Sequence, residues 1–165
     1  MVDELVRGLQ AAHENAPQPI VRLLTGAGGE GKSAALIQIA ARLLKGEQAW
    51  TCLRRRASAA PLPANWAEVM PHTDNHAWIV AIDDAENVGS DLPAALRSLG
   101  ARTDVHFLLA AREADWGLKA GRDMMWQSVA NFQRVPLAGL DEEDARRIIN
   151  SWVAWGDKAM GKLRG

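Results

Sequence analysis

Cysteine and long apolar runs are scarce in this sequence, and each scarcity excludes a class of protein. Cys52 is the only cysteine in 165 residues, so no internal disulfide can form and a reducing cytoplasm is the expected location. No apolar run reaches the roughly 18 residues of a membrane-spanning helix, and residues 1–10 do not resemble a signal peptide. With a formal net charge of −1, no broadly cationic nucleic-acid surface is expected.

Apolar runs and helical patterns alternate along most of the chain. Short apolar or β-rich runs predict strands at residues 20–25, 49–54, 76–82, 105–111 and 133–137. Helical spacing predicts helices at residues 2–14, 33–45, 66–70, 92–99, 122–131 and 142–155. This alternation predicts an α/β fold of three layers, in which a parallel sheet is covered by helices on both faces.

The strongest motif is a glycine-rich loop between the first expected strand and the helix that follows. Its residues are Gly26, Ala27, Gly28, Gly29, Glu30, Gly31, Lys32 and Ser33, which match the pattern G-x-x-x-x-G-K-[ST]. Glycines let backbone amides turn inward around phosphates, and the helix N-terminus adds its dipole. Lys32 is expected to contact the β- and γ-phosphates, and Ser33 to ligate Mg²⁺. Glu30 occupies a variable position and is expected to face solvent.

Two acids follow the strand at residues 76–82. Asp83 is expected to hold Mg²⁺, while Asp84 is the first candidate for the base that polarises the attacking water. Glu86 is the alternative base. A turn or helix cap is the structural alternative for both aspartates.

Arg112 closes the expected strand at residues 105–111. An arginine at that strand end can contact a γ-phosphate through a charge-assisted hydrogen bond. The alternative is a surface ion pair with Glu113 or Asp115.

Together these segments resemble the STAND class of P-loop ATPases, signal-transducing switches of the AAA-like branch. The loop from Gly26 to Ser33 resembles their Walker A motif, and the run from Ile79 to Asp84 resembles their Walker B motif. The run from Phe107 to Trp116 resembles the sensor strand of bacterial members. The likeness spans about residues 18–155.

The resemblance implies a five-stranded sheet in the order 5-1-4-3-2 and an ATP-dependent switch. Nucleotide state would control oligomerisation or exposure of an effector. Family members usually continue into a helical subdomain with a Gly-x-Pro adenine contact, but no such tripeptide follows the last expected helix. We therefore expect one domain of a larger protein, with downstream domains or an effector as partners and slow turnover in isolation.

Three segments and three functions follow from these patterns. Residues 1–17 are interpreted as a helix and linker, 18–140 as the nucleotide-binding core, and 141–165 as a helix and tail that begin a truncated helical subdomain.

The leading function is Mg²⁺-ATP binding and hydrolysis with ATP and Mg²⁺ as cofactors. The alternatives are a small-molecule kinase and a nucleotide-binding interaction module without turnover. A GTPase is disfavoured because no Asn-Lys-x-Asp segment is present.

Overall fold

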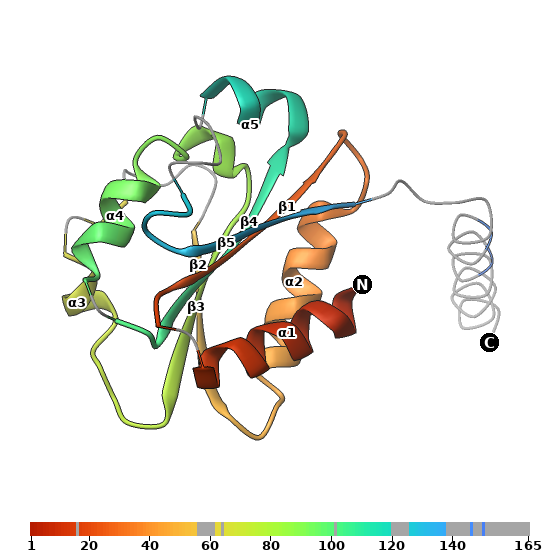
Figure 1. Cartoon of the computed structure of the whole chain (residues 1–165). Coiled ribbons are helices and arrows are strands. Elements are labelled where there is room, and N and C mark those ends of the chain that lie inside the picture. The colour runs from red at the N-terminus through yellow and green to blue at the C-terminus, as the bar shows by residue number, and fades with distance from the viewer. Residues whose placement is uncertain are drawn as a thin grey trace, which may run out of the picture.

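The protein is built around a five-stranded parallel sheet whose strand order is β2-β3-β4-β1-β5 (Figure 1). The computed structural model describes residues 1–15, 17–55, 62–63, 65–100, 102–119 and 126–137, with Arg146 and Asn150. The elements in chain order are α1 (Val2–Asn15), β1 (Ile20–Gly26), α2 (Lys32–Leu43), β2 (Ala49–Arg55), α3 (Trp66–Val69), β3 (His76–Ile82), η1 (Ala85–Asn87, a 3₁₀ helix), α4 (Leu92–Ser98), β4 (Val105–Arg112), α5 (Glu113–Lys119) and β5 (Asn131–Pro136). The expected α/β fold and strand order are confirmed.

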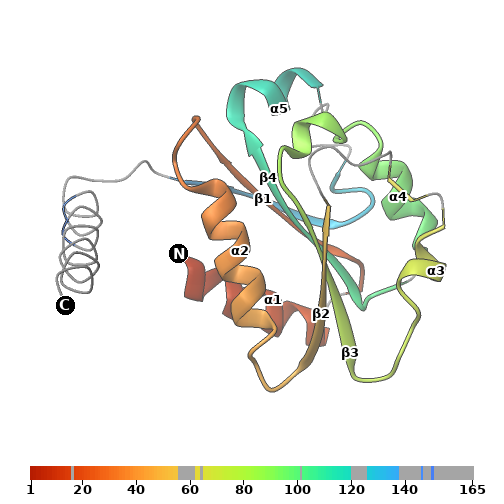
Figure 2. The same cartoon turned by 180° about the vertical axis from the view of Figure 1, so that it is seen from behind.

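Helices cover both faces of the sheet, as the continuous apolar strands predict. Helices α1 and α2 lie on one face, and α3, α4 and α5 lie on the other (Figures 1 and 2). Side chains alternate along β1, so Ile20 and Leu24 join the core under α1 and α2, while Val21 and Leu23 join the core on the opposite face. The sheet is therefore buried on both sides, with β1 between β4 and β5.

The helix after the glycine loop is held by one apolar stripe. Its buried residues Ala35, Leu36, Ile39, Ala40 and Leu43 recur at helical spacing and face the sheet. Good helix formers fill the rest of α2, so propensity and packing agree. The first turn of α2 is thereby anchored at the carboxyl end of β1.

One helix prediction is wrong for the residues that the structure describes. Residues 126–129 form a turn and Asn131 already begins β5, although a helix was expected over 122–131. The reason is packing: Trp126 is fully buried and stacks on Phe132, their ring centroids 5.3 Å apart. The helix expected at 142–155 lies outside the described residues, except for Arg146 and Asn150, which are helical.

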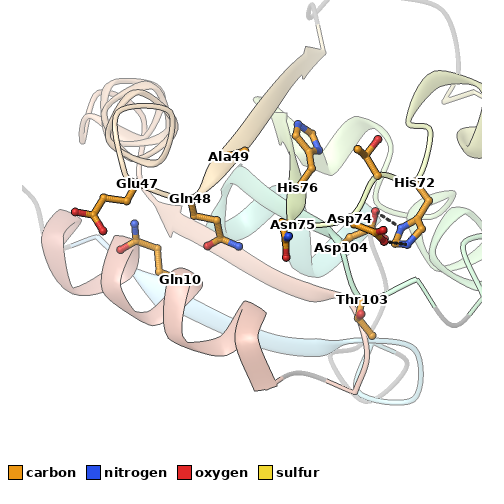
Figure 3. A pocket seen from close by; sticks show the side chains of 11 residues that line it. Gln10, Glu47, Gln48, Ala49, His72, Asp74, Asn75, His76, Thr103 and Asp104 are labelled. Carbon is orange, nitrogen blue, oxygen red and sulfur yellow. Dashed lines mark hydrogen bonds and ion pairs between the residues drawn. The ribbon is translucent and has the colours of Figure 1, made fainter.

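The loops that enter β3 and β4 are joined by a buried carboxylate. Asp104, with a side chain 8% exposed, accepts two hydrogen bonds of 2.6 Å from Arg102. It accepts a third, of 3.1 Å, from His72, which Figure 3 shows. Arg102 also donates to the carbonyl oxygen of Met70, at 2.7 Å. Burial raises the pKa of the Asp104 carboxyl, but the hydrogen bonds from Arg102 and His72 outweigh it, so this pKa lies below its usual value.

Asp104→Asn tests this contact through the pH dependence of stability. A folded-state pKa below the unfolded-state value of about 4 means that ionised Asp104 stabilises the fold above that pH, and that this stability is lost as pH falls through the folded-state pKa. Leaving Arg102 without its carboxylate should cost about 2 kcal/mol in the free energy of unfolding at pH 7, measured by urea unfolding. The deficit should shrink towards pH 3. A deficit of equal size at both pH values would contradict the assignment, and Glu47→Gln, at an exposed residue outside this contact, is the control.

Candidate functional site

The glycine loop connects the end of β1 to the start of α2. Gly29 and Gly31 have φ angles of 84° and 79°, in the left-handed region that a side chain makes unfavourable. Gly31 directly precedes the first residue of α2, Lys32. The loop therefore delivers backbone amides and a helix N-terminus to the same place, an arrangement that suits phosphate binding.

A cavity of about 380 Å³ opens beside this loop at the carboxyl ends of the strands. Its lining combines the loop, the segment after β3 and the end of β4: Gly28, Gly29, Gly31, Lys32, Ser33, Ala34, Asp83, Asp84, Ala110 and Arg112. Lys32 and Arg112 bring positive charge, and the two aspartates bring negative charge. Ligands of open parallel sheets bind at this edge.

Strand pairing explains how these distant residues meet. β1 pairs with β4 in parallel, and the register places Arg112 opposite Gly26, the first residue of the loop. β4 also pairs with β3, whose last residue Ile82 lies opposite Leu109. Asp83 follows Ile82 directly, so the acids lie one strand away from the arginine and two strands away from the loop.

The two aspartates lie in a tight, half-buried turn. Asp84 has φ 49° and ψ 45°, a left-handed conformation that aspartate tolerates better than most residues. The backbone amide of Asp84 donates a hydrogen bond of 3.1 Å to Oδ1 of Asp83. This turn places both carboxylates at the cavity wall.

Glu86 is not at the cavity, unlike Asp84. The residue lies in η1 and is 5% exposed, and its Oε2 atom has no hydrogen-bond partner among the described residues. Of the two candidate bases, Asp84 lines the cavity, whereas Glu86 is buried in the protein interior.

Gly26, Ala27 and Glu30, which the sequence pattern included among the binding residues, do not line the cavity. Glu30 is half-buried, and its carboxylate folds back to accept a 2.5 Å hydrogen bond from the Ala27 amide. Two lining residues, Ala34 and Ala110, were missed. Position alone points to them: Ala34 follows Ser33 in the first helical turn, and Ala110 lies two residues before Arg112, on the same side of β4.

Arg112 is exposed at the cavity and belongs to none of the ion pairs within the described part of the chain. Glu113, one of the two surface partners considered as the alternative for Arg112, lies 3.0 Å from Arg134 of β5. The guanidinium is therefore available to a ligand in the cavity.

A larger cavity, of about 1080 Å³, lies at the opposite edge of the sheet. Its walls include Gln10 of α1, Glu47 and the loops before β3 and β4, as Figure 3 shows. Apart from Ala49 its lining is polar, and the described residues contain no group of three His, Cys, Asp or Glu side chains suited to a metal ion. Because the cavity lies at the amino ends of the strands, it is not the phosphate site.

The strand order, the left-handed glycine loop and the helix that follows it define the class of P-loop NTPases. Residues 1–138 match the family model described as "Novel STAND NTPase 5", and the chain belongs to this family. It is an ATPase-type nucleotide-binding domain. No curated protein matches the chain.

Solved structures share the fold at low sequence identity. The Aeropyrum pernix ORC2 protein, in ADPNP–ADP complexes, superposes with a TM-score of 0.66 at 16% identity, over 90% of this chain and 50% of that one. The Thermotoga maritima RuvB Holliday junction branch migration motor gives 0.59 at 17% identity, over 94% and 50%. The Escherichia coli MS115-1 HORMA:CdnC:Trip13 complex gives 0.60 at 13% identity, over 92% and 66%. The chain thus spans about half the length of ORC2 and RuvB. Within the described residues, no helix is long and apolar enough to cross a membrane.

Proposed function

We propose that this domain binds and hydrolyses Mg²⁺-ATP and acts as the nucleotide-dependent switch of a larger signal-transducing protein in the cytoplasm. The observation that carries the proposal is the composition of one cavity, which holds the glycine loop, Lys32, two carboxylates and an arginine. Each of these groups matches one part of a triphosphate and its metal ion.

The phosphate chain is assigned to the loop and Lys32. Amides of Gly28 to Lys32 and the N-terminus of α2 provide donors and a positive dipole end without a mobile side chain. The Lys32 ammonium donates a hydrogen bond to the carbonyl oxygen of Ala27, which holds it across the loop. Lys32 therefore lies where it can contact the β- and γ-phosphates.

The oxygen donors at the cavity fit Mg²⁺. Ser33 is exposed in the first turn of α2, and the half-buried Asp83 lies across the same cavity. A hydroxyl and a carboxylate are hard oxygen ligands, the kind that Mg²⁺ takes in nucleotide sites. Bound there, Mg²⁺ would neutralise phosphate charge.

Asp84 and Arg112 are assigned to the γ-phosphate end. Asp84 would accept a proton from, or polarise, the attacking water, because its carboxylate is the second acid at the cavity. Arg112 would donate a charge-assisted hydrogen bond to the γ-phosphate, a contact that hydrolysis removes. Since Arg112 leads directly into α5, loss of this contact offers a route from nucleotide state to the rest of the protein.

The partners proposed are the downstream domains or effector of a longer protein, together with a nucleotide-controlled oligomer. The chain spans half of the Aeropyrum pernix ORC2 protein, whose solved structure is of ADPNP–ADP complexes, and this supports a role as one module of several. Nucleic acid is not proposed as a partner, because the net charge of the chain is −1.

Asp84→Asn should separate binding from hydrolysis. The amide keeps the size of the side chain but cannot take a proton, so phosphate release should slow by about a hundredfold while Mg²⁺-ATP affinity stays within about threefold of wild type. Steady-state and single-turnover phosphate release measure the rate, and calorimetry measures the affinity. Asp74→Asn, at the opposite edge of the sheet, is the matched control. Wild-type turnover in Asp84→Asn would show that the base is another group, while a wild-type protein that binds ATP without turnover would support the interaction-module alternative.

Arg112→Ala should weaken the binding of ATP much more than the binding of ADP. A contact made only to the third phosphate is worth about 1.5–3 kcal/mol, so the dissociation constant for ATP should rise about ten- to a hundredfold while that for ADP changes little. The ratio of the two constants is the quantity to compare with wild type. Arg97→Ala, an exposed arginine of α4, should leave the ratio unchanged. Equal losses for ATP and ADP would reject a γ-phosphate contact.

A further inference from the structure

The phosphate loop contains an acid, although its proposed ligand is a polyanion. Glu30 lies one residue before Gly31 and two before Lys32, within a loop whose other residues line the cavity from Gly28 to Ser33. A carboxylate at this place repels phosphate by Coulomb's law. Contacts of Glu30 that stabilise the loop must therefore offset this repulsion.

The contacts of Glu30 supply that stabilisation. Its Oε2 atom accepts a 2.5 Å hydrogen bond from the backbone amide of Ala27, and Lys32 donates to the carbonyl oxygen of the same residue. Ala27 is thus held by its N–H on one side and by its C=O on the other. These two contacts tie the beginning of the loop to its end.

Glu30 makes its contact from outside the cavity. Neither Glu30 nor Ala27 lines the cavity, whereas Gly28, Gly29 and Gly31 do. A Cβ atom at Gly26 would collide with Oε2 of Glu30 and would lie 3.4 Å from the carbonyl oxygen of Leu137, just after β5. The carboxylate therefore sits over Gly26 on the β5 side of the loop, away from the space assigned to phosphate.

We propose that Glu30 is a positioning residue of the phosphate loop, whose carboxylate braces the Ala27 peptide and keeps the loop amides turned towards the cavity before nucleotide arrives. The inference rests on the proposed nucleotide-binding function and deepens it. Ordering the loop in advance lowers the conformational entropy that binding must otherwise remove. That gain outweighs the repulsion between one partly exposed carboxylate and the phosphates, which water screens.

Two neutral variants separate bracing from charge. Glu30→Gln removes the charge but keeps an oxygen that can accept from the Ala27 amide, whereas Glu30→Ala removes both. Titration calorimetry with Mg²⁺-ATP should give Glu30→Gln a dissociation constant equal to or below that of wild type. Glu30→Ala should bind about fivefold or more weakly than Glu30→Gln, the factor that one hydrogen bond of about 1 kcal/mol provides.

The outcomes distinguish this inference from the proposed function. If both variants bind ATP equally well, or if Glu30→Ala binds more tightly, Glu30 acts only as a repelling charge and the inference is wrong while the nucleotide site stands. If wild type does not bind Mg²⁺-ATP at all, both are wrong. Glu47→Ala and Glu47→Gln, at the opposite edge of the sheet, are the matched controls and should bind as wild type.

Equal thermal midpoints without nucleotide show that the variants fold alike. If Glu30→Ala does not fold, Glu30→Leu replaces it in the comparison with Glu30→Gln, because leucine fills similar space but has no hydrogen-bond acceptor. It too should bind about fivefold or more weakly than Glu30→Gln, and equal affinities would overturn the inference.

Discussion

The parallel pairing of β1 with β4 is the constraint on which the site depends. Its register sets Gly26 opposite Arg112, and the pairing of β4 with β3 brings Asp83 to the same edge of the sheet. Because the pairing is buried on both faces, a register slip would expose apolar side chains from two cores at once. The geometry of the charged groups is therefore secured by apolar packing some distance from them.

The glycine loop adds the second layer of organisation. Left-handed turns at Gly29 and Gly31 bend the chain into α2, while Glu30 and Lys32 hold the Ala27 peptide between them. A flexible glycine-rich segment has a large entropy to lose on binding, and these contacts remove part of it beforehand. Rigid strands and a braced loop together give a site organised before any ligand enters.

Sequence patterns predicted the strands, since continuous apolar runs are local signals. The strand order came from the resemblance to the STAND class, which begins from a complete phosphate-loop motif. The sequence patterns failed where long-range packing decides. Helix α5 was not expected, because its seven residues include a glycine at position 117 and carry little helical propensity. Packing holds this helix instead: Trp116 is fully buried, and its ring centroid lies 5.3 Å from that of Trp126. The sequence placed Asp83, Asp84 and Arg112 at the correct strand ends, but side-chain directions such as that of Glu30, and the pairing of Glu113 with Arg134, depend on neighbours distant in sequence.

The central claim is that a nucleoside triphosphate binds at the carboxyl edge of the sheet, with its phosphates on the glycine loop. Backbone amide chemical shifts, measured by NMR on ¹⁵N-labelled protein during titration with Mg²⁺-ATP, test it most directly. The account predicts the largest changes at residues 28–33, at Asp83 and Asp84, and at Arg112, with little change at residues 72–76 by the other cavity. Changes concentrated at residues 72–76 instead, or none at 28–33 under saturating nucleotide, would contradict it.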